Sequence, residues 1–199
     1  MFVFNEIKKN APQIISWVDD IIVSLDGDEV LHNAIRNIPD AFSKMAEGIE
    51  AIKEIDPSFK ITARTVIHQQ NYKQWPLIID AAKKLGVNQI SFLPADVSSH
   101  AFNREVLWDE GRQQEILIRE EELTRLNVII DELITVYHHD FENRFIMESP
   151  EKIRKIAQYY ASFYNLAVPP YKKCNAPWVS VVVEADGTVR PCFFHEPYG

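Results

Sequence analysis

The side chains best suited to metal chemistry lie near the carboxyl end of the sequence. Cys174 and Cys192 are the only two cysteines, and they flank an Asp186-Gly187 turn, with His195 close behind. Thiolates and imidazoles bind zinc, and iron–sulfur clusters usually need four thiolates. The spacing C-x17-C-x2-H lacks the close pairs of zinc motifs, so zinc, a disulfide and free thiols all stay open. We favour free thiols, because a cytoplasmic setting disfavours the disulfide.

An arginine inside an apolar, β-branched run is the second unusual feature. Arg64 interrupts the sequence ITARTVI (61–67). A buried guanidinium without a partner is energetically costly. Arg64 is therefore expected either to face a wet cavity and bind a carboxylate, or to pair with Asp26 or an acid on a covering helix. We favour the cavity.

Polar residues that follow apolar runs are candidate ligand contacts, because ligands bind at the carboxyl ends of parallel strands. Ser24 and Asp26 end the first run, although a buried hydroxyl and a plain turn explain them equally well. A long polar loop at 95–111 follows the third run and is the best candidate for substrate recognition, or else a surface excursion. Its candidate substrate-binding residues are Asp96, Ser98 and His100, with Asn103 and Arg104 nearby.

Other histidines and polar residues have simpler explanations. His32 and Arg36 are four residues apart on an expected helix, where they suit a solvated face. Asn71 suits a helix cap. His138 and His139 are adjacent on a helix, so their side chains are expected to point in different directions rather than to form a metal pair.

The elements that must position these residues alternate in type. Continuous or alternating apolar runs predict strands at 20–26, 60–67 and 88–94, the first of them buried on both faces. Helical spacing of apolar residues predicts helices over 5–17, 41–55 and 72–85, the last ended by Gly86. The order strand–helix–strand–helix–strand predicts a parallel sheet.

The rest of the sequence is expected to be helical and then to end in a hairpin. Helices are predicted over 115–138 and from Ser149-Pro150 to about residue 164. Strands at 178–184 and 188–192 are expected to form a hairpin turned by 185–187, with Trp178, Trp108 and Phe193 supplying core or interface area. A domain boundary near Val168 divides the chain into 1–168 and 169–199.

Composition places the chain among globular proteins. The 199 residues are 46% hydrophobic and 25% charged, with a net charge of −8. No cluster of Lys and Arg suits nucleic acid, and no apolar run is long enough to span a membrane. The start of the sequence lacks the order of charges of a signal peptide, so we expect a cytoplasmic protein without a nucleic-acid or membrane partner.

Three segments together resemble the radical S-adenosylmethionine (SAM) enzymes. They are DIIVSLDG (20–27) with His32 and Arg36, ITARTVI (61–67) with Asn71, and GVNQISFLP (86–94). The pattern C-x12-G-x4-C from Cys174 to Cys192 is similar to the opening of the SPASM and twitch extensions of that superfamily, which bind auxiliary iron–sulfur clusters.

The resemblance implies a fold, two cofactors and a reaction. It implies half of a partial (β/α)6 TIM-like barrel in 1–168, followed by helices and the first hairpin of a cluster domain in 169–199. Cys174 and Cys192 would bind metal, Ser24, Asp26 and Arg64 would contact SAM, and a [4Fe–4S] cluster would cleave SAM reductively. The substrate would be a peptide or small molecule; its identity, the product and the number of auxiliary clusters are not specified by the sequence.

The sequence also departs from the family. It has no C-x3-C-x2-C loop, so an internal or truncated piece that does not itself cleave SAM is expected. A three-strand remnant would leave an exposed strand edge that favours self-association. The alternatives are a noncatalytic α/β module that binds an anion through Arg64 and the Asp96 loop, and a small zinc protein with a Cys/His hairpin.

Overall fold

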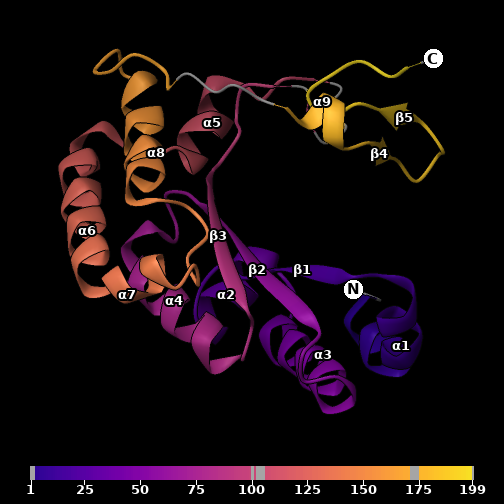
Figure 1. Cartoon of the computed structure of the whole chain (residues 1–199). Helices are drawn as coiled ribbons and strands as arrows, with labels where there is room; N and C mark the ends of the chain where they lie inside the picture. The colour runs from indigo at the N-terminus through magenta and orange to yellow at the C-terminus, as the bar shows by residue number, and fades with distance from the viewer. Residues whose placement is uncertain (1–2, 100, 102–105, 171–174, 199) are drawn as a thin grey trace.

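A three-stranded parallel sheet organises the chain, as the order of elements predicts. The structure, a computed structural model, describes residues 3–99, 101, 106–170 and 175–198. Strands β1 (Asp20–Ser24), β2 (Lys60–Ile67) and β3 (Gln89–Pro94) pair in the order β1-β2-β3, and both pairings are parallel (Figure 1). In the described part of the chain the sheet does not close into a barrel.

Helices connect the strands in the expected places. Helices α2 (Glu29–Arg36) and α3 (Ala41–Ile55) link β1 to β2. A 3-10 turn at Tyr72–Gln74 and α4 (Trp75–Lys84) link β2 to β3. Gly86 follows α4 with φ of +69°, a conformation that glycine adopts without steric strain, so this helix ends where the sequence predicts.

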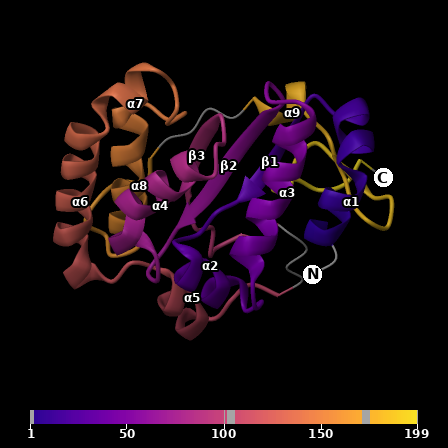
Figure 2. The same ribbon diagram turned by 90° about the horizontal axis from the view of Figure 1, so that it is seen from below.

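One face of the sheet forms the core. Ile61, Ala63, Thr65 and Ile67 alternate along β2 and are fully buried on this face. Phe92 of β3 packs against Trp75 of α4, with ring centroids 5.2 Å apart. Helices α4 and α8 lie beside β3 (Figure 2), and α3 packs against α1 and α2.

The opposite face of the sheet is open, which corrects the expectation that the first strand is buried on both faces. Ile22 of β1 is 53% exposed, and the register partners Val66 of β2 and Leu93 of β3, farther along this face, are also exposed. The polar Thr62 and Ser91 between them are buried. Ser24 is exposed here too, so it is not a buried hydroxyl. We call this surface the open face.

The two edges of the sheet differ. No strand among the described residues pairs with the outer edge of β1. The outer edge of β3 is extended by the segment 145–148, through a parallel bridge between Ile90 and Ile146. The Ile90 amide donates to Phe145 O at 2.7 Å, and the Met147 amide donates to Ile90 O at 2.9 Å. This isolated bridge at the sheet edge was not predicted from the sequence.

The helix predicted over 115–138 is wrong as a single element. The structure has α5 (Glu110–Ile116), a 3-10 turn at Glu120–Glu122, α6 (Leu123–Val136) and α7 (His138–Glu142). Leu117 is extended, with φ −63° and ψ 138°, because Leu117 and Ile118 turn into the core. Helix α8 (Pro150–Ser162) begins as predicted, and the Ser149 hydroxyl accepts a hydrogen bond from the Lys152 amide.

The hairpin is smaller than predicted. Helix α9 (Ala176–Val179) replaces the start of its first strand, and β4 (Val182–Val183) pairs antiparallel with β5 (Val189–Arg190). Trp178 is 81% exposed, so it contributes nothing to the core, and Phe193 is exposed as well. The hairpin lies far from α6 and α8 (Figure 1).

The first helix is confirmed. Helix α1 (Val3–Trp17) is kinked at Asn10, two residues before Pro12, and packs on α3. Within the described residues, no helix combines the length and hydropathy that a bilayer crossing requires.

Candidate ligand site at the carboxyl ends of the strands

A buried acid cluster lies directly after β1. Asp26 is 4% exposed and accepts from Arg36 through Nε at 2.5 Å and a terminal nitrogen at 3.0 Å. His32 is 1% exposed, and its Nδ1 lies 3.2 Å from both the Asp26 amide nitrogen and Oδ2. The prediction of a solvated face is therefore wrong for His32, which is buried against Asp26. Arg36 is exposed, and its guanidinium pairs with Asp26 from the edge of the cluster.

The charge state of Asp26 follows from these contacts. Burial alone raises the pKa of this carboxyl, but the hydrogen bonds from His32 and Arg36 and the Arg36 charge outweigh it, so the pKa lies below its usual value. Asp26 is therefore ionised at neutral pH, and its partners Arg36 and His32 both lie on α2, the helix that follows it.

Asn71 fixes the ends of β1 and β2 to each other. It is fully buried, and its Nδ2 donates to Asp26 O at 3.1 Å and Val66 O at 3.0 Å. Its Oδ1 accepts from the His68 amide at 2.9 Å. The side chain makes no cap hydrogen bond to the following 3-10 turn, so it is a bridge between strand ends rather than a helix cap.

Burial determines the charge state of His68, which lies next to Asn71 and Asp26. His68 is 8% exposed, and burial lowers the pKa of its imidazole, although the Asp26 charge partly opposes this. His68 is therefore neutral at physiological pH, and Asp26, His68 and Asn71 form a rigid support for the strand ends.

Arg64 lies on the open face in a row of polar residues. It is the register partner of Ser24 on β1 and of Ser91 on β3, so the three side chains project from the same face. Its Nε is buried and has no hydrogen-bond partner in the described part of the chain. The expected alternative, an ion pair between Arg64 and Asp26, is wrong, because Asp26 is held by Arg36 and His32.

Glu148 lies at the end of the same row. It ends the segment that pairs with β3, and its carboxylate accepts from Ser91 Oγ at 3.0 Å and the Phe92 amide at 2.9 Å. Burial raises the pKa of Glu148, and the two hydrogen bonds only partly oppose this. Sequence reasoning missed Ser91 and Glu148; the available signals were a serine inside an apolar run and an acid before Ser149-Pro150.

The loop after β3 is more ordered than a surface excursion. Asp96 accepts from the Ser98 amide at 3.4 Å and from the Ser99 hydroxyl, and Val97 is fully buried. Ser98 is exposed. His100, Asn103 and Arg104 lie outside the described residues, so the substrate-recognition role of this loop stays a prediction.

The expected metal ligands are only partly visible. Cys192 is a half-buried free thiol and His195 is exposed, while Cys174 lies outside the described residues. Within the described ranges no group of three His, Cys, Asp or Glu side chains could hold a metal ion. The His138 and His139 ring centroids lie 3.9 Å apart with their planes tilted by 38°, and their Nδ1 atoms contact different groups, Thr135 O and Glu142 Oε2.

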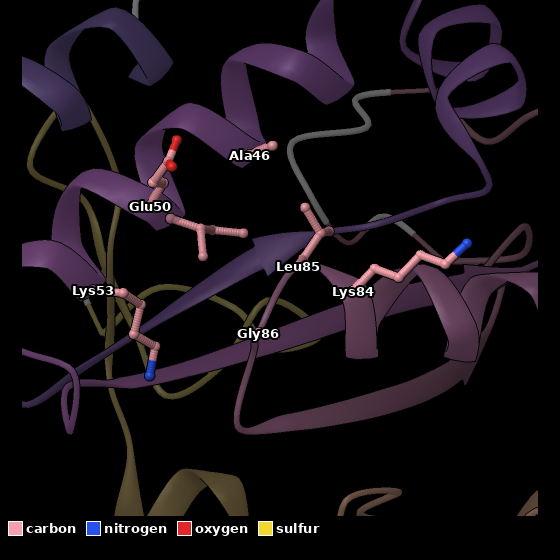
Figure 3. Close-up of a pocket in the computed structure, with 7 residues that line it drawn as sticks. Ala46, Glu50, Lys53, Lys84, Leu85 and Gly86 are labelled. Carbon is pink, nitrogen blue, oxygen red and sulfur yellow. The ribbon is translucent and has the colours of Figure 1, made fainter.

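A shallow pocket of about 350 Å³ lies at the other end of the sheet. It is lined by residues of α3 and of the turn from α4 to β3, among them Lys53, Lys84 and Gly86 (Figure 3). Lys53 and Lys84 extend to opposite sides of it, and Lys53 is bound to Phe59 O at 2.8 Å and Asn88 Oδ1 at 3.0 Å. The pocket faces the amino ends of the strands, so we assign it no ligand.

Comparison with known proteins adds no assignment. No protein-family model matches the chain, and no curated protein is significantly similar to it.

Proposed function

We propose that this chain binds SAM on the open face of its sheet, as the cofactor-binding part of a radical SAM enzyme with a half-barrel fold. Its resemblance to that family in sequence, and the parallel sheet with helices against one face, support the proposal. In the intact enzyme the reaction would be reductive cleavage of SAM and radical modification of a peptide or small molecule.

The observation that supports the proposal most directly is the buried Arg64 Nε that has no hydrogen-bond partner among the described residues. A guanidinium is always charged and forms paired hydrogen bonds with a carboxylate. The buried Arg64 Nε has no partner, which costs free energy in the protein without ligand. The carboxylate of SAM would satisfy it, and the exposed Ser24 hydroxyl in the same row would supply a second contact.

The iron–sulfur cluster does not fit the residues at hand. The sequence holds two cysteines and no C-x3-C-x2-C pattern, and no described cluster of side chains offers three ligands. We therefore derive no chemical step through a cluster, and the proposal for these residues concerns binding of SAM.

Isothermal titration of SAM into wild-type protein and the variant Arg64→Met tests the proposal. We expect the substitution to weaken binding about tenfold or more, because a charge-assisted pair is lost. The matched control is Lys60→Met, which removes an exposed cation from the same strand and face. Equal affinity of wild type and Arg64→Met for SAM would overturn the proposal.

The same arginine also suits a simpler anion-binding module without catalysis. Methionine, which shares the amino-acid end of SAM, separates the two functions. A SAM-binding site should bind SAM more tightly than methionine, since the adenosine adds buried area. Equal affinities would favour the module.

A further inference from the structure

The open face carries two opposite charges that do not pair with each other. Arg64 and Ser91 are register partners on adjacent strands, which lie about 4.8 Å apart. The carboxylate of Glu148 is 3.0 Å from Ser91 Oγ. Arg64 and Glu148 are therefore separated by roughly one to two strand spacings, and no ion pair joins them.

Glu148 has acceptor capacity left over. An ionised carboxylate has about four acceptor sites, and the hydrogen bonds from Ser91 and the Phe92 amide, with a contact from the amide of Glu148 itself, do not fill all of them. No cation of the described chain forms an ion pair with Glu148. Burial destabilises the charged form of this half-buried carboxylate and raises its pKa, and its hydrogen bonds and the Lys152 charge offset this only in part.

We propose that Ser91 and Glu148 form a binding site for a protonated amine, one strand away from Arg64, so that the open face selects a ligand that carries both an amine and a carboxylate. The ammonium would bind the free acceptor sites of Glu148. Only the carboxylate contact rests on the proposed function of Arg64; the amine contact stands on the geometry of Ser91 and Glu148.

A purely structural role for Glu148 predicts a different result. The Glu148 carboxylate also accepts a hydrogen bond from the Phe92 amide at the edge of β3, where the segment 145–148 ends. Glu148→Gln keeps the shape and one oxygen acceptor for this amide and removes the charge. If Glu148 only caps the edge, this variant should leave ligand selectivity unchanged.

The test uses ω-amino acids of increasing length, which differ in the distance between their amine and carboxylate groups. Those with three to five methylenes, from 4-aminobutyrate to 6-aminohexanoate, are titrated into the whole chain and followed by amide shifts in NMR spectra, each beside the monocarboxylate of equal length. In wild type we expect the best-fitting amino acid to bind about tenfold more tightly than its monocarboxylate. Glu148→Gln should abolish this preference without lowering the melting temperature, whereas the exposed Glu151→Gln should retain it.

Each outcome bears on one claim. Equal binding of amino acids and monocarboxylates by wild type, or a preference that survives Glu148→Gln, overturns the amine site. If Arg64→Met leaves monocarboxylate binding intact while the amine preference persists, the proposed function fails and the amine site stands. No binding of any member at about 50 mM overturns both.

Discussion

The charged residues Asp26, after β1, and Arg64, within β2, differ in whether the protein itself supplies their partners. Asp26 follows an apolar run and was a candidate ligand contact. In the structure Arg36 and His32 bind its carboxylate, and their hydrogen bonds and charge lower its pKa. Arg64, which sequence reasoning paired with Asp26 as one alternative, is the side chain left with an unsatisfied donor. Asp26 is therefore best understood as part of the frame, and Arg64 as the group available to a ligand.

Asp26→Asn should destabilise the protein by about 2–3 kcal/mol at pH 7, because it leaves the Arg36 guanidinium without its counter-charge in a partly buried site. Urea unfolding at pH 7 measures the effect. Asp19→Asn, at an exposed position before the other end of β1, should change the free energy of unfolding by less than about 0.5 kcal/mol. Equal losses in the two variants would contradict the pairing seen for Asp26.

The ion pair between Asp26 and Arg36 makes the stability of the fold depend on pH. Because the folded-state pKa of Asp26 is lowered, its contribution is fully present above the unfolded-state pKa of about 4 and is lost as pH falls through the folded-state value. The difference between wild type and Asp26→Asn should therefore shrink below about pH 4. A difference that is constant from pH 7 to pH 3 would show that the ionised carboxylate is not the stabilising form.

The spacing of apolar residues within a segment predicts a helix or strand correctly when contacts within that segment decide its conformation. Helix α3 and strand β2 have the predicted bounds, because apolar spacing and β-branched alternation are properties of the segments themselves. The long helix failed at Leu117 and Ile118, where burial in the core outweighs helical spacing. The bridge at Ile146 is likewise a long-range pairing that a three-residue apolar run does not reveal.

Gly86 gives an element-scale prediction. An added Cβ would meet nothing within 4 Å, so the cost of substitution there comes from the backbone alone. With φ of +69°, Gly86→Ala should lower the free energy of unfolding by about 1–2 kcal/mol, measured in urea. Gly86→Asn should cost less, because asparagine tolerates this conformation better. A larger loss for asparagine than for alanine would point to side-chain clash and contradict the argument.

For the whole molecule, the main feature is a sheet with its core on one face and exposed apolar side chains, among them Ile22, Val66 and Leu93, on the other. In the described part of the chain no strand pairs with the outer edge of β1, and apolar side chains of the open face are exposed; both features agree with the predicted tendency to self-associate. The association itself stays a prediction.

Sedimentation of the chain at about 100 µM should therefore show dimers or larger species. Ile22→Lys places a charge on the edge strand and the open face, and it should shift the population towards monomer. Val30→Lys, at an exposed position of α2, is the matched control and should not. Wild type that remains monomeric at this concentration would exclude the edge as an association surface.

The sequence alone determined the α/β class, the parallel order of three strands, the approximate bounds of α1, α3, α4 and α8, and the unusual position of Arg64. These follow from hydrophobic period, from caps such as Gly86, and from the high cost of burying a lone guanidinium, all of which act over a few residues. Tertiary structure decided which face of the sheet is covered, which acid pairs with which base, and that Glu148 reaches Ser91 from 57 positions away. Such contacts depend on distances in space between segments remote in sequence, and local propensity carries no information about them.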